Sequence, residues 1–504
     1  MTRTLWLLAL LALLWTGSAT ATNHPSLIPD QDNPAPLQVY IAPGERIQAV
    51  IENHPPGTTF IIGAGVHRRQ TITPRDGDIF IGESGAVLNG ANLITEFVAF
   101  GDVWIIEGQD QIGWAAGECI EGFERCSYGE DLFLDDVPLQ HVTSRDQVGP
   151  GRWYFDYDND RVFMGDDPTG RKVEVSGSYG AFIAEGARDV VIRNLIIEKY
   201  AAPGQVGAIR ANDSVNWIVE DNTVQLNHGV GIVVGDGMIV RRNRVINNGQ
   251  MGVSGEGDNV IIEQNEIAYN NYASFAPGWE AGGVKLVGTS GAIVRHNYVH
   301  HNRGPGLWTD SDNINVLYED NIVVHNRGPG IFHEISYDAT IRHNVVMFNS
   351  PIPAAWLYGA QILISSSRSA QIYDNLVVVS AEGGNAITVL QQFRGEGNHG
   401  EFFATDNRIA QNTIVFMGDM GINGTGTDWE IERFWREAVN TFERNVYYLQ
   451  PEYANLDFWQ YDNQSLNWDE VVSRTDQERG SIFVPRLPRH IAEIPPWPYS
   501  AGAS

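Results

Sequence analysis

The sequence is poor in cysteine. Its 504 residues include only two, Cys119 and Cys126. In an oxidising compartment two cysteines so close along the chain can pair across a small loop, and a single pair allows only one connectivity. A zinc site is the competing interpretation, but two thiols without a nearby histidine pattern make a poor one. The spacing therefore favours a disulfide.

Basic residues are also few. The chain has 33 Lys and Arg residues against 62 Asp and Glu, a formal net charge of −29. Nucleic acids and anionic membranes both reward a basic surface, so this balance argues against either as a partner. An anionic substrate would need a local basic patch.

Long apolar runs are missing after the first residues. No later stretch approaches the roughly 18 to 20 apolar residues that a transmembrane helix needs. At the start, Arg3 precedes an apolar run over residues 5–15 and a small-residue end at Ala19-Thr20-Ala21. This order predicts a secretory signal peptide over residues 1–21, cleaved after Ala21. The expected protein is secreted or periplasmic, has no membrane span and is a monomer.

Internal repetition is the main structural signal. The string Asn-Arg-Gly-Pro-Gly begins at Asn302 and again at Asn326, and 326 − 302 gives a period of 24 residues. From Val190 onward a short apolar segment followed by asparagine recurs, with copies ending at Asn222, Asn243, Asn265, Asn297, Asn321, Asn344, Asn375, Asn412 and Asn445. A period this short predicts a solenoid, because each short strand buries its apolar side chains only by stacking on its neighbours.

The repeated asparagines are predicted to be scaffold. An asparagine tolerates left-handed backbone at a turn, and its amide can hydrogen-bond to the same residue in the next coil. The residue recurs at every coil, whereas a catalytic site occurs once.

The amino-terminal part carries a family resemblance. Residues 47–66 predict a short helix, a turn and a strand, and short strands between glycines follow over residues 72–91. This opening resembles the cap and first coils of bacterial right-handed parallel β-helix (pectin-lyase-like) proteins that act on polysaccharides. The resemblance implies an all-β, single-stranded right-handed parallel β-helix solenoid in an exported carbohydrate-active protein. The sequence has neither the paired-Asp motifs of polygalacturonases nor the Asp-Pro-His-Glu motif of mannuronan epimerases.

The predicted organisation has four parts after the signal peptide. Residues 22–113 form a leader, an amino-terminal cap and the first coils, and residues 114–178 form a small antiparallel β insertion, because residues 131–140, 153–157 and 161–165 are typical of hairpin strands. Residues 179–450 form the parallel β-helix with its site-forming loops, and residues 451–504 form a closing segment and tail.

Two outward columns contain the candidate catalytic residues. Aligning the coils puts Val233, Ser254, Lys285, Trp308, Phe332 and Thr388 in one column and Gly235, Glu256, Val287, Asp310, Glu334 and Leu390 in the next. Neighbouring parallel strands lie about 4.8 Å apart, so Asp310 and Glu334 should be adjacent, with Glu256 two coils from Asp310. Carboxylates stacked in this way repel each other and raise at least one pKa. That cost favours a catalytic role for Asp310, Glu334, Glu256 and Lys285.

Three functions fit these columns. A glycoside hydrolase uses two carboxyl groups, about 5 to 5.5 Å apart when configuration is retained and roughly 6.5 to 9.5 Å apart when it is inverted. A polysaccharide lyase or epimerase would use carboxylates to hold Ca²⁺ against a uronate, with Lys285 or an arginine abstracting the proton. A non-catalytic glycan-binding or envelope protein is the third. The hydrolase is the first hypothesis, with no metal or other cofactor, and Ca²⁺ belongs to the second alone.

The predicted substrate-binding residues surround the carboxyl pair: Trp308, Phe332, Arg303, Arg327, Trp279, His333 and Trp356. Outward aromatic rings beside acids suit a pyranose ring, although a plain cross-strand stack explains them too. The two arginines could clamp a uronate or could be solvated turn residues. The two other tryptophans lie in long loops, which in solenoids gather on the binding face. His333 falls on the inward phase, where it is a packed core residue unless a bulge turns it outward.

Overall fold

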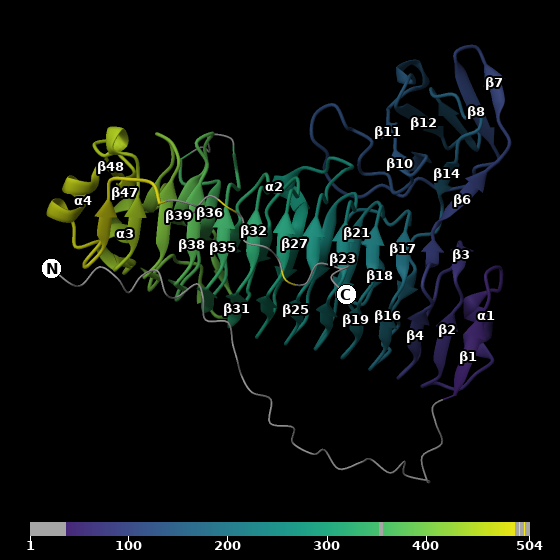
Figure 1. Cartoon of the computed structure of the whole chain (residues 1–504), viewed down its shortest axis with the longest axis horizontal. Helices are drawn as coiled ribbons and strands as arrows, with labels where there is room; N and C mark the ends of the chain where they lie inside the picture. The colour runs from purple at the N-terminus through teal and green to yellow at the C-terminus, as the bar shows by residue number, and fades with distance from the viewer. Residues whose placement is uncertain (1–36, 352–355, 489–492, 494–497, 499–504) are drawn as a thin grey trace, which may run out of the picture. The chain divides into compact units, whose positions relative to one another are not determined.

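The computed structural model describes residues 37–351, 356–488, 493 and 498. The predicted signal peptide and its cleavage site therefore lie outside the described residues. Within the described residues, no helix has the length and apolar character needed to cross a membrane. From Leu37 onward the strands stack coil upon coil, from β1 at one end to β47 and α4 at the other (Figure 1).

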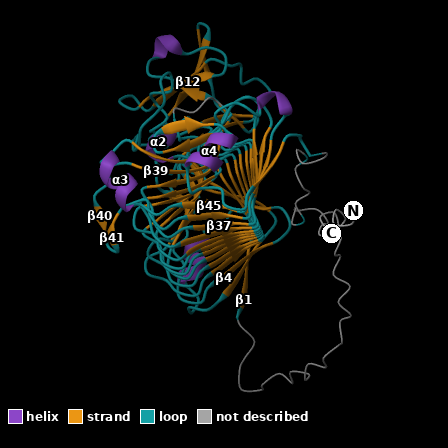
Figure 2. Ribbon diagram, turned by 90° about the vertical axis from the view of Figure 1, so that its left-hand side faces the viewer, coloured by secondary structure: helices purple, strands orange, loops and turns teal. Residues whose placement is uncertain are grey.

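Three long sheets run along this stack, and their strands pair in parallel apart from the last pair of the second sheet (Figure 2). The first sheet consists of β1 (Gln38–Ile41), β2 (Thr59–Ile62), β4 (Ile79–Gly82), β16 (Val191–Arg193), β19 (Ile218–Glu220), β22 (Ile239–Arg241), β25 (Ile261–Glu263), β28 (Ile293–Arg295), β31 (Val316–Glu319), β34 (Ala339–Arg342), β37 (Gln371–Tyr373), β42 (Arg408–Ala410) and β45 (Thr441–Glu443). The second consists of β15 (Phe182–Ile183), β18 (Gly207–Arg210), β21 (Val230–Val234), β24 (Met251–Gly255), β27 (Gly282–Val287), β30 (Leu307–Asp310), β33 (Ile331–Glu334), β36 (Ala360–Ser365), β39 (Asn385–Gln391), β44 (Asn423–Thr427), β47 (Trp459–Tyr461) and β48 (Gln464–Leu466). The third consists of β3 (Gly65–Arg68), β5 (Ala86–Asn89), β17 (Ile196–Glu198), β20 (Thr223–Gln225), β23 (Arg244–Ile246), β26 (Glu266–Ala268), β29 (Tyr298–His300), β32 (Ile322–Val324), β35 (Val345–Met347), β38 (Leu376–Val379), β43 (Thr413–Phe416), β46 (Val446–Tyr448) and β49 (Ile482–Val484).

Helices are short and lie outside the sheets. They are α1 (Ile47–Glu52), α2 (Pro277–Glu280), α3 (Ile431–Glu437), α4 (Trp468–Arg474) and the 3₁₀ turns η1 (Arg145–Gln147) and η2 (Pro451–Tyr453). The predicted helix at residue 47 is confirmed as α1, whose buried Ile47 and Ile51 join the core beside the first coils.

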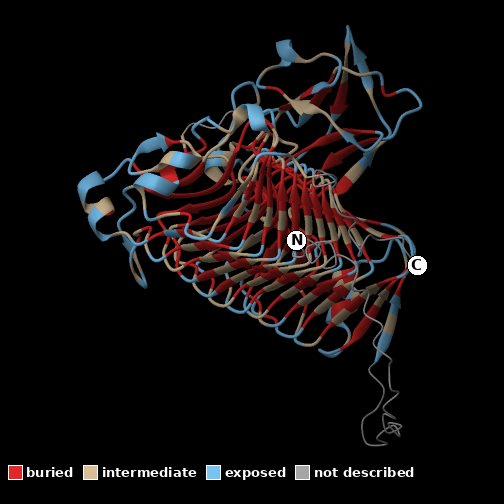
Figure 3. Cartoon of the chain, turned by 60° about the vertical axis from the view of Figure 1, so that its left-hand side comes forward, coloured by how far each residue is buried: buried red, intermediate tan, exposed pale blue. Residues whose placement is uncertain are grey.

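The core is continuous along the solenoid. Most strands turn an apolar side chain inward, and the register stacks these side chains in columns, as with Val294, Tyr318 and Ile341 on β28, β31 and β34. All three belong to one buried cluster that extends from Ile41 to Val471. The buried strand segments facing this interior are visible in Figure 3. Apolar burial of this kind contributes roughly 25 cal/mol per Å², which stabilises the stack as a whole.

Two asparagine ladders run through the turns. The first links successive side chains from Asn222 to Asn445 by amide-to-carbonyl hydrogen bonds of 2.9–3.1 Å. The second runs in the same way from Asn227 to Asn349 and ends on Gln361. Every ladder residue is buried. The scaffold role predicted for these asparagines is confirmed.

The predicted left-handed backbone lies one residue earlier than expected. In each turn the positive φ falls on the residue before the ladder asparagine, for example 56° at both His296 and His325. The asparagine itself must keep its amide aligned with the next coil, so the preceding residue, which is exposed or half-buried, takes the strained conformation.

The insertion is antiparallel apart from one short parallel pair and stands to one side of the stack (Figure 1). Its strands are β6 (Ala91–Ile94), β7 (Val98–Phe100), β8 (Val103–Glu107), β9 (Leu132–Leu134), β10 (Val137–Pro138), β11 (Gln140–His141), β12 (Arg152–Asp156), β13 (Arg161–Met164) and β14 (Val173–Ser176). It begins at Ala91, earlier than the predicted start at residue 114, because β6 to β8 have the same short strand-and-glycine pattern as the first coils. A separate small hairpin, β40 (Glu396–Gly397) and β41 (Gly400–Glu401), lies in the loop after β39.

The disulfide favoured by the sequence is confirmed between Cys119 and Cys126. Its loop pairs with the loop before β27, through an antiparallel bridge between Cys119 and Phe275. The insertion is thereby attached to the loop that ends in α2.

Candidate active site

The strand register confirms the predicted columns of the second sheet except for Gly235 and Glu256, which lie beyond the ends of β21 and β24. Lys285 pairs with Trp308 and Trp308 with Phe332, while Asp310 pairs with Glu334. The next coil, β36, was left out of the prediction. It adds Leu363 and Ser365 to the two columns, and it was missed because a long loop precedes it.

The two aromatic rings face away from the core. Trp308 and Phe332 belong to a cluster that is separate from the solenoid core, with Leu363 and Leu390 from later coils. Their rings stack at 5.4 Å between centroids and 11° between planes. Only 6% and 7% of these residues is exposed. The two rings are therefore packed side chains, and a pyranose could contact only the small part of each ring that is exposed.

Lys285 is held by two carboxylates. Its Nζ lies 2.7 Å from Glu280 Oε1 and 2.8 Å from Asp310 Oδ2. It also lies 3.8 Å from the centroid of the Trp308 ring, a cation–π contact. The residue is 2% exposed, and a buried ammonium is tolerated only with such partners.

Glu334 is the carboxyl group that the site perturbs most clearly. Burial, together with the negative charge of Asp310, raises the pKa of Glu334 to about 7. Arg394 and Lys285 act in the opposite direction, and Arg394 Nη2 lies 2.9 Å from Glu334 Oε1. The Trp308 indole also lowers this pKa, although its N–H has no described partner at ordinary hydrogen-bond geometry. Near neutral pH the site therefore holds an acid that can still donate a proton beside Asp310.

A cavity of about 480 Å³ opens over this acid. Its size falls within the range of roughly 300 to 1,000 Å³ typical of small-molecule sites. It is lined by Pro277, Gly278, Pro305, Trp308, Arg327, Gly328, Pro329, Phe332, Glu334, Ser350, Tyr358, Gly359 and Arg394. We call it the acid cavity. Asp310 pairs with Glu334 but is not among the lining residues, and 18% of its side chain is exposed.

Glu256 does not join the carboxyl pair. Strand β24 ends at Gly255, so Glu256 is exposed beyond the last paired residue. It lines a different cavity of about 490 Å³, together with Glu280. The prediction that Glu256 assists Asp310 directly is therefore not supported, since the alignment assumed that the strand continued.

Two predicted substrate-binding residues are placed elsewhere. His333 is fully buried inside the solenoid, with Nδ1 2.8 Å from Thr309 Oγ1, and burial lowers its pKa to about 4. Trp279 packs beside Phe275 in the cluster around the disulfide. Neither lines the acid cavity, so both predictions are corrected.

Of the remaining predicted residues Trp356, Arg327 and Arg303, only Arg327 lines the acid cavity. Trp356 packs against the cluster of Trp308 and Phe332 without lining the cavity. Arg327 lines the acid cavity, whereas its repeat partner Arg303 lines another cavity, near the insertion. The proposed clamp of both arginines on one uronate is therefore not formed.

Three residues of the site were not predicted: Glu280, Tyr358 and Arg394. They lie in or beside the long loops before β27, before β36 and after β39. The extra length of these loops predicted that they lie at the binding face, but it did not indicate which of their residues would reach the site. Tyr358 donates its hydroxyl to Gln392, which also accepts from Arg394.

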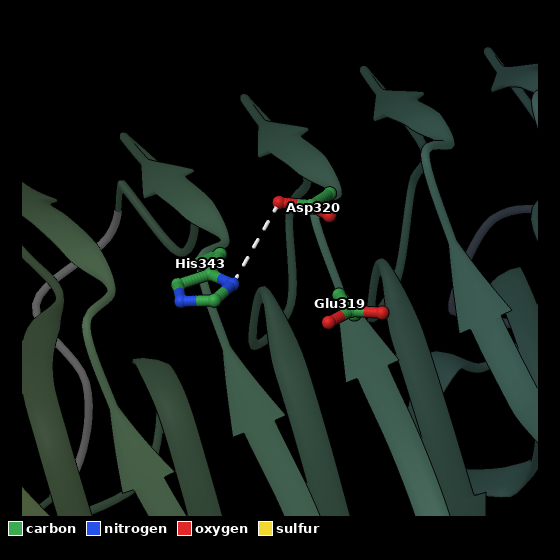
Figure 4. A group of neighbouring side chains, drawn as sticks. All are labelled: Glu319, Asp320 and His343. Atoms are coloured by element: carbon green, nitrogen blue, oxygen red, sulfur yellow. Dashed lines mark ion pairs between the residues drawn. The ribbon is translucent and has the colours of Figure 1, made fainter.

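One surface cluster has the residue types of a metal site. Glu319, Asp320 and His343 place ligand atoms within 4.8 Å of one another at a turn of the first sheet (Figure 4). Glu319 is already ion-paired with Arg342, and His343 lies 4.0 Å from Asp320. Exposed acidic groups of this kind are common without a metal, and no metal role is assigned to them.

Comparisons with known proteins bear on the fold. Residues 207–377 match the family described as "Right handed beta helix region". XylC, solved in complex with xylose, is 16% identical, with 90% of this chain and 86% of that chain covered and a TM-score of 0.68. The A-module of mannuronan C-5 epimerase AlgE4 from Azotobacter vinelandii is 14% identical, with 87% and 91% covered and a TM-score of 0.50. No curated protein matches the chain in sequence. The right-handed parallel β-helix expected from the opening coils is thus confirmed.

Proposed function

We propose that this right-handed parallel β-helix is a glycoside hydrolase, with Glu334 as the proton donor and Asp310 as the second carboxyl group. The observation that carries the proposal is the pairing of Asp310 with Glu334 on adjacent strands, with Asp310 held by Lys285 and Glu334 lining the acid cavity. Burial there raises the pKa of Glu334 to about 7. Two carboxyl groups whose environments differ in this way are the usual equipment for cleaving a glycosidic bond.

The reaction assigns one role to each group. Glu334 gives its proton to the glycosidic oxygen as the bond from that oxygen to the anomeric carbon breaks. Asp310 either attacks the anomeric carbon or takes a proton from the water that does so. Adjacent strands lie about 4.8 Å apart, closer to the separation of retaining enzymes than to that of inverting ones.

The surroundings support a sugar substrate. The acid cavity combines aromatic and proline surfaces with a few polar groups, which suits a pyranose ring and its hydroxyls. The structurally similar XylC was solved with xylose. Pentose-containing and hexose-containing glycans are therefore the first substrates to try.

A lyase or epimerase acting on a uronate is the second candidate. Arg327 and Arg394 both line the acid cavity, and arginine is suited to a carboxylate. However, the Lys285 ammonium is already bound by Glu280 and Asp310, so it is poorly placed to serve as the base. Elimination would form unsaturated products, whose ultraviolet absorbance separates the two reactions.

A panel of polysaccharides and oligosaccharides tests the proposal. New reducing ends should appear with the unmodified protein and be lost in Glu334→Gln. Glu263→Gln is the matched control, because Glu263 also ends a strand and pairs with an arginine, but on the first sheet. Binding without any product would favour a non-catalytic glycan-binding protein.

A further inference from the structure

The cavity that Arg303 lines lies where the insertion meets the β-helix. It has a volume of about 230 Å³, smaller than the usual range for drug-sized ligands, so it would hold one small group. We call it the junction cavity. It is lined by Phe123, Arg125, Cys126, Asp131, Pro138, Leu139, Gln140, His141, His228, Tyr272, Ala273 and Arg303.

Two buried hydrogen-bond donors on residues that line the junction cavity lack acceptors among the described residues. Arg125 stacks over the ring of Tyr128 at 4.2 Å, and its Nη1 is buried without a hydrogen-bond partner among the described residues. His141 accepts the backbone N–H of Phe155 at Nε2, which places its proton on Nδ1 when the ring is neutral. Burial, with Arg125 and His228 nearby, holds the pKa of His141 well below its ordinary value. The Nδ1 of His141 is also buried and has no described partner.

His228 adds a positive charge to the same wall. Its Nδ1 lies 3.0 Å from Asp131 Oδ2 and its Nε2 lies 2.7 Å from the carbonyl oxygen of Cys126. Both neighbours accept hydrogen bonds, so the ring must be protonated on both nitrogens to satisfy them. Burial lowers the pKa of His228, but Asp131 and the Cys126 carbonyl outweigh it and the pKa is raised.

The carboxylate that lines the cavity is already neutralised. Asp131 faces the imidazolium of His228 and accepts the Tyr272 hydroxyl at 2.6 Å. The preceding residue, Glu130, accepts the Tyr157 hydroxyl, and burial raises the pKa of Glu130. Arg125 and Arg303 therefore remain as cationic groups without a carboxylate partner among the lining residues.

We propose that the junction cavity binds an oxyanion group, a carboxylate or a sulfate, carried by a ligand. Buried donors without partners are costly, and an oxyanion would satisfy Arg125 and His141 together. The chain as a whole has a net charge of −29, whereas this cavity is lined by two arginines whose charges no lining carboxylate neutralises. The inference does not depend on glycoside hydrolysis at Glu334.

Calorimetry and melting curves with two probes test this site on the full chain. Sodium sulfate is compared with sodium chloride at equal ionic strength, and sodium glucuronate is compared with glucose. Saturable binding of at least one oxyanion, with a rise in melting temperature, is expected. Binding of both probes identifies the oxyanion alone as the ligand group, whereas binding of glucuronate alone makes the sugar part of the ligand.

Variants locate the binding. Arg125→Gln should weaken it at least tenfold, and Arg303→Gln, at an exposed turn, provides a second test if the first variant folds poorly. Arg145→Gln is the matched control, because Arg145 also stacks on insertion rings, those of Phe100 and Phe163, but lies outside the cavity.

Two results would overturn the inference. One is the absence of saturable oxyanion binding to the folded unmodified protein. The other is unchanged binding in both Arg125→Gln and Arg303→Gln. Glu334→Gln should keep oxyanion binding even if it abolishes hydrolysis, so the two proposals can fail separately.

Discussion

The asparagine ladders and the outward columns of the second sheet are made by the same repeat, but they treat polar groups differently. In the ladder, Asn297 is buried and its side chain gives and accepts hydrogen bonds on both neighbouring coils. In the columns, Lys285, Asp310 and Glu334 follow one another on β27, β30 and β33, and the pKa of Glu334 is raised. In the ladder, the same side chain on each coil provides hydrogen-bond partners for its neighbours. In the columns, the side chain changes from coil to coil, and the carboxyl group of Glu334 is buried beside Asp310 with a raised pKa.

We therefore expect the asparagine ladders to contribute mainly to stability and the outward columns to contribute mainly to reactivity. A ladder position is replaceable only by another residue that continues the hydrogen bonds. A column position can change without breaking the coil, because its side chain lies outside the core. Changes in the two regions should therefore affect different measurements.

The largest effect is expected for the carboxyl pair. Glu334→Gln removes the proton donor and Asp310→Asn removes the second carboxyl group, and general acid–base catalysis of this kind contributes about 10²- to 10⁴-fold. We expect losses of kcat/KM of that order on any substrate the protein cleaves. Full activity in both variants would show that the site lies elsewhere.

A ladder variant should give the opposite pattern. Asn297→Ala removes the acceptor shared by the backbone N–H and the side-chain amide of Asn265, and it removes the amide that donates to the Ile262 carbonyl and to Asn321 Oδ1. Each unsatisfied group costs about 1 to 3 kcal/mol, so the free energy of unfolding should fall by roughly 2 to 5 kcal/mol. The urea midpoint measures this loss, while activity per folded molecule should change little. An unaltered midpoint would contradict the scaffold role.

The disulfide should connect the two regions. Replacing Cys119 and Cys126 by serine opens a short loop, which costs about 2 to 3 kcal/mol of stability. The same loop pairs with Phe275, just before α2. The last residue of α2 is Glu280, which forms an ion pair with Lys285. We expect a several-fold fall in kcat at temperatures where the variant is folded. If only the melting temperature changes, the loop does not position the site.

Replacing Glu334 should also give a gain in stability. The pKa of Glu334 is raised from 4.5 to about 7, so the unfolded chain loses its proton first and stability falls as pH rises through this window. Glu334→Gln removes this penalty and should stabilise the fold at pH ~8 by up to about 3 kcal/mol relative to the unmodified chain. Below pH ~4.5 the two should agree. Melting curves of the variant and the unmodified chain at both pH values measure this difference. A lower melting temperature of Glu334→Gln at the higher pH would contradict the expected gain.

Sequence reasoning recovered the parts that repeat. The short period predicted the solenoid, and coil alignment brought Lys285, Trp308 and Phe332, and likewise Asp310 and Glu334, into register, because pairing between stacked coils depends only on spacing. The disulfide followed from the short spacing of the only two cysteines, the expected oxidising compartment and the lack of a nearby histidine pattern.

Loops and strand ends were not recoverable in the same way. Glu280 and Arg394 reach the site from loops whose paths the repeat does not determine, and Glu256 is lost from it because β24 ends one residue earlier. Trp279 was expected at the binding face, but its loop packs onto the disulfide. Contacts between segments far apart in the chain determine these outcomes.

The most direct test of the central claim is the titration of Glu334 itself. Carboxyl ¹³C resonances of glutamate-labelled protein would be followed from pH ~3 to pH ~9, with Glu334 assigned by its absence from Glu334→Gln. We expect a midpoint at a pH of about 7, which should fall when Asp310→Asn removes the neighbouring charge. A midpoint near the ordinary glutamate value of 4.5 would contradict it.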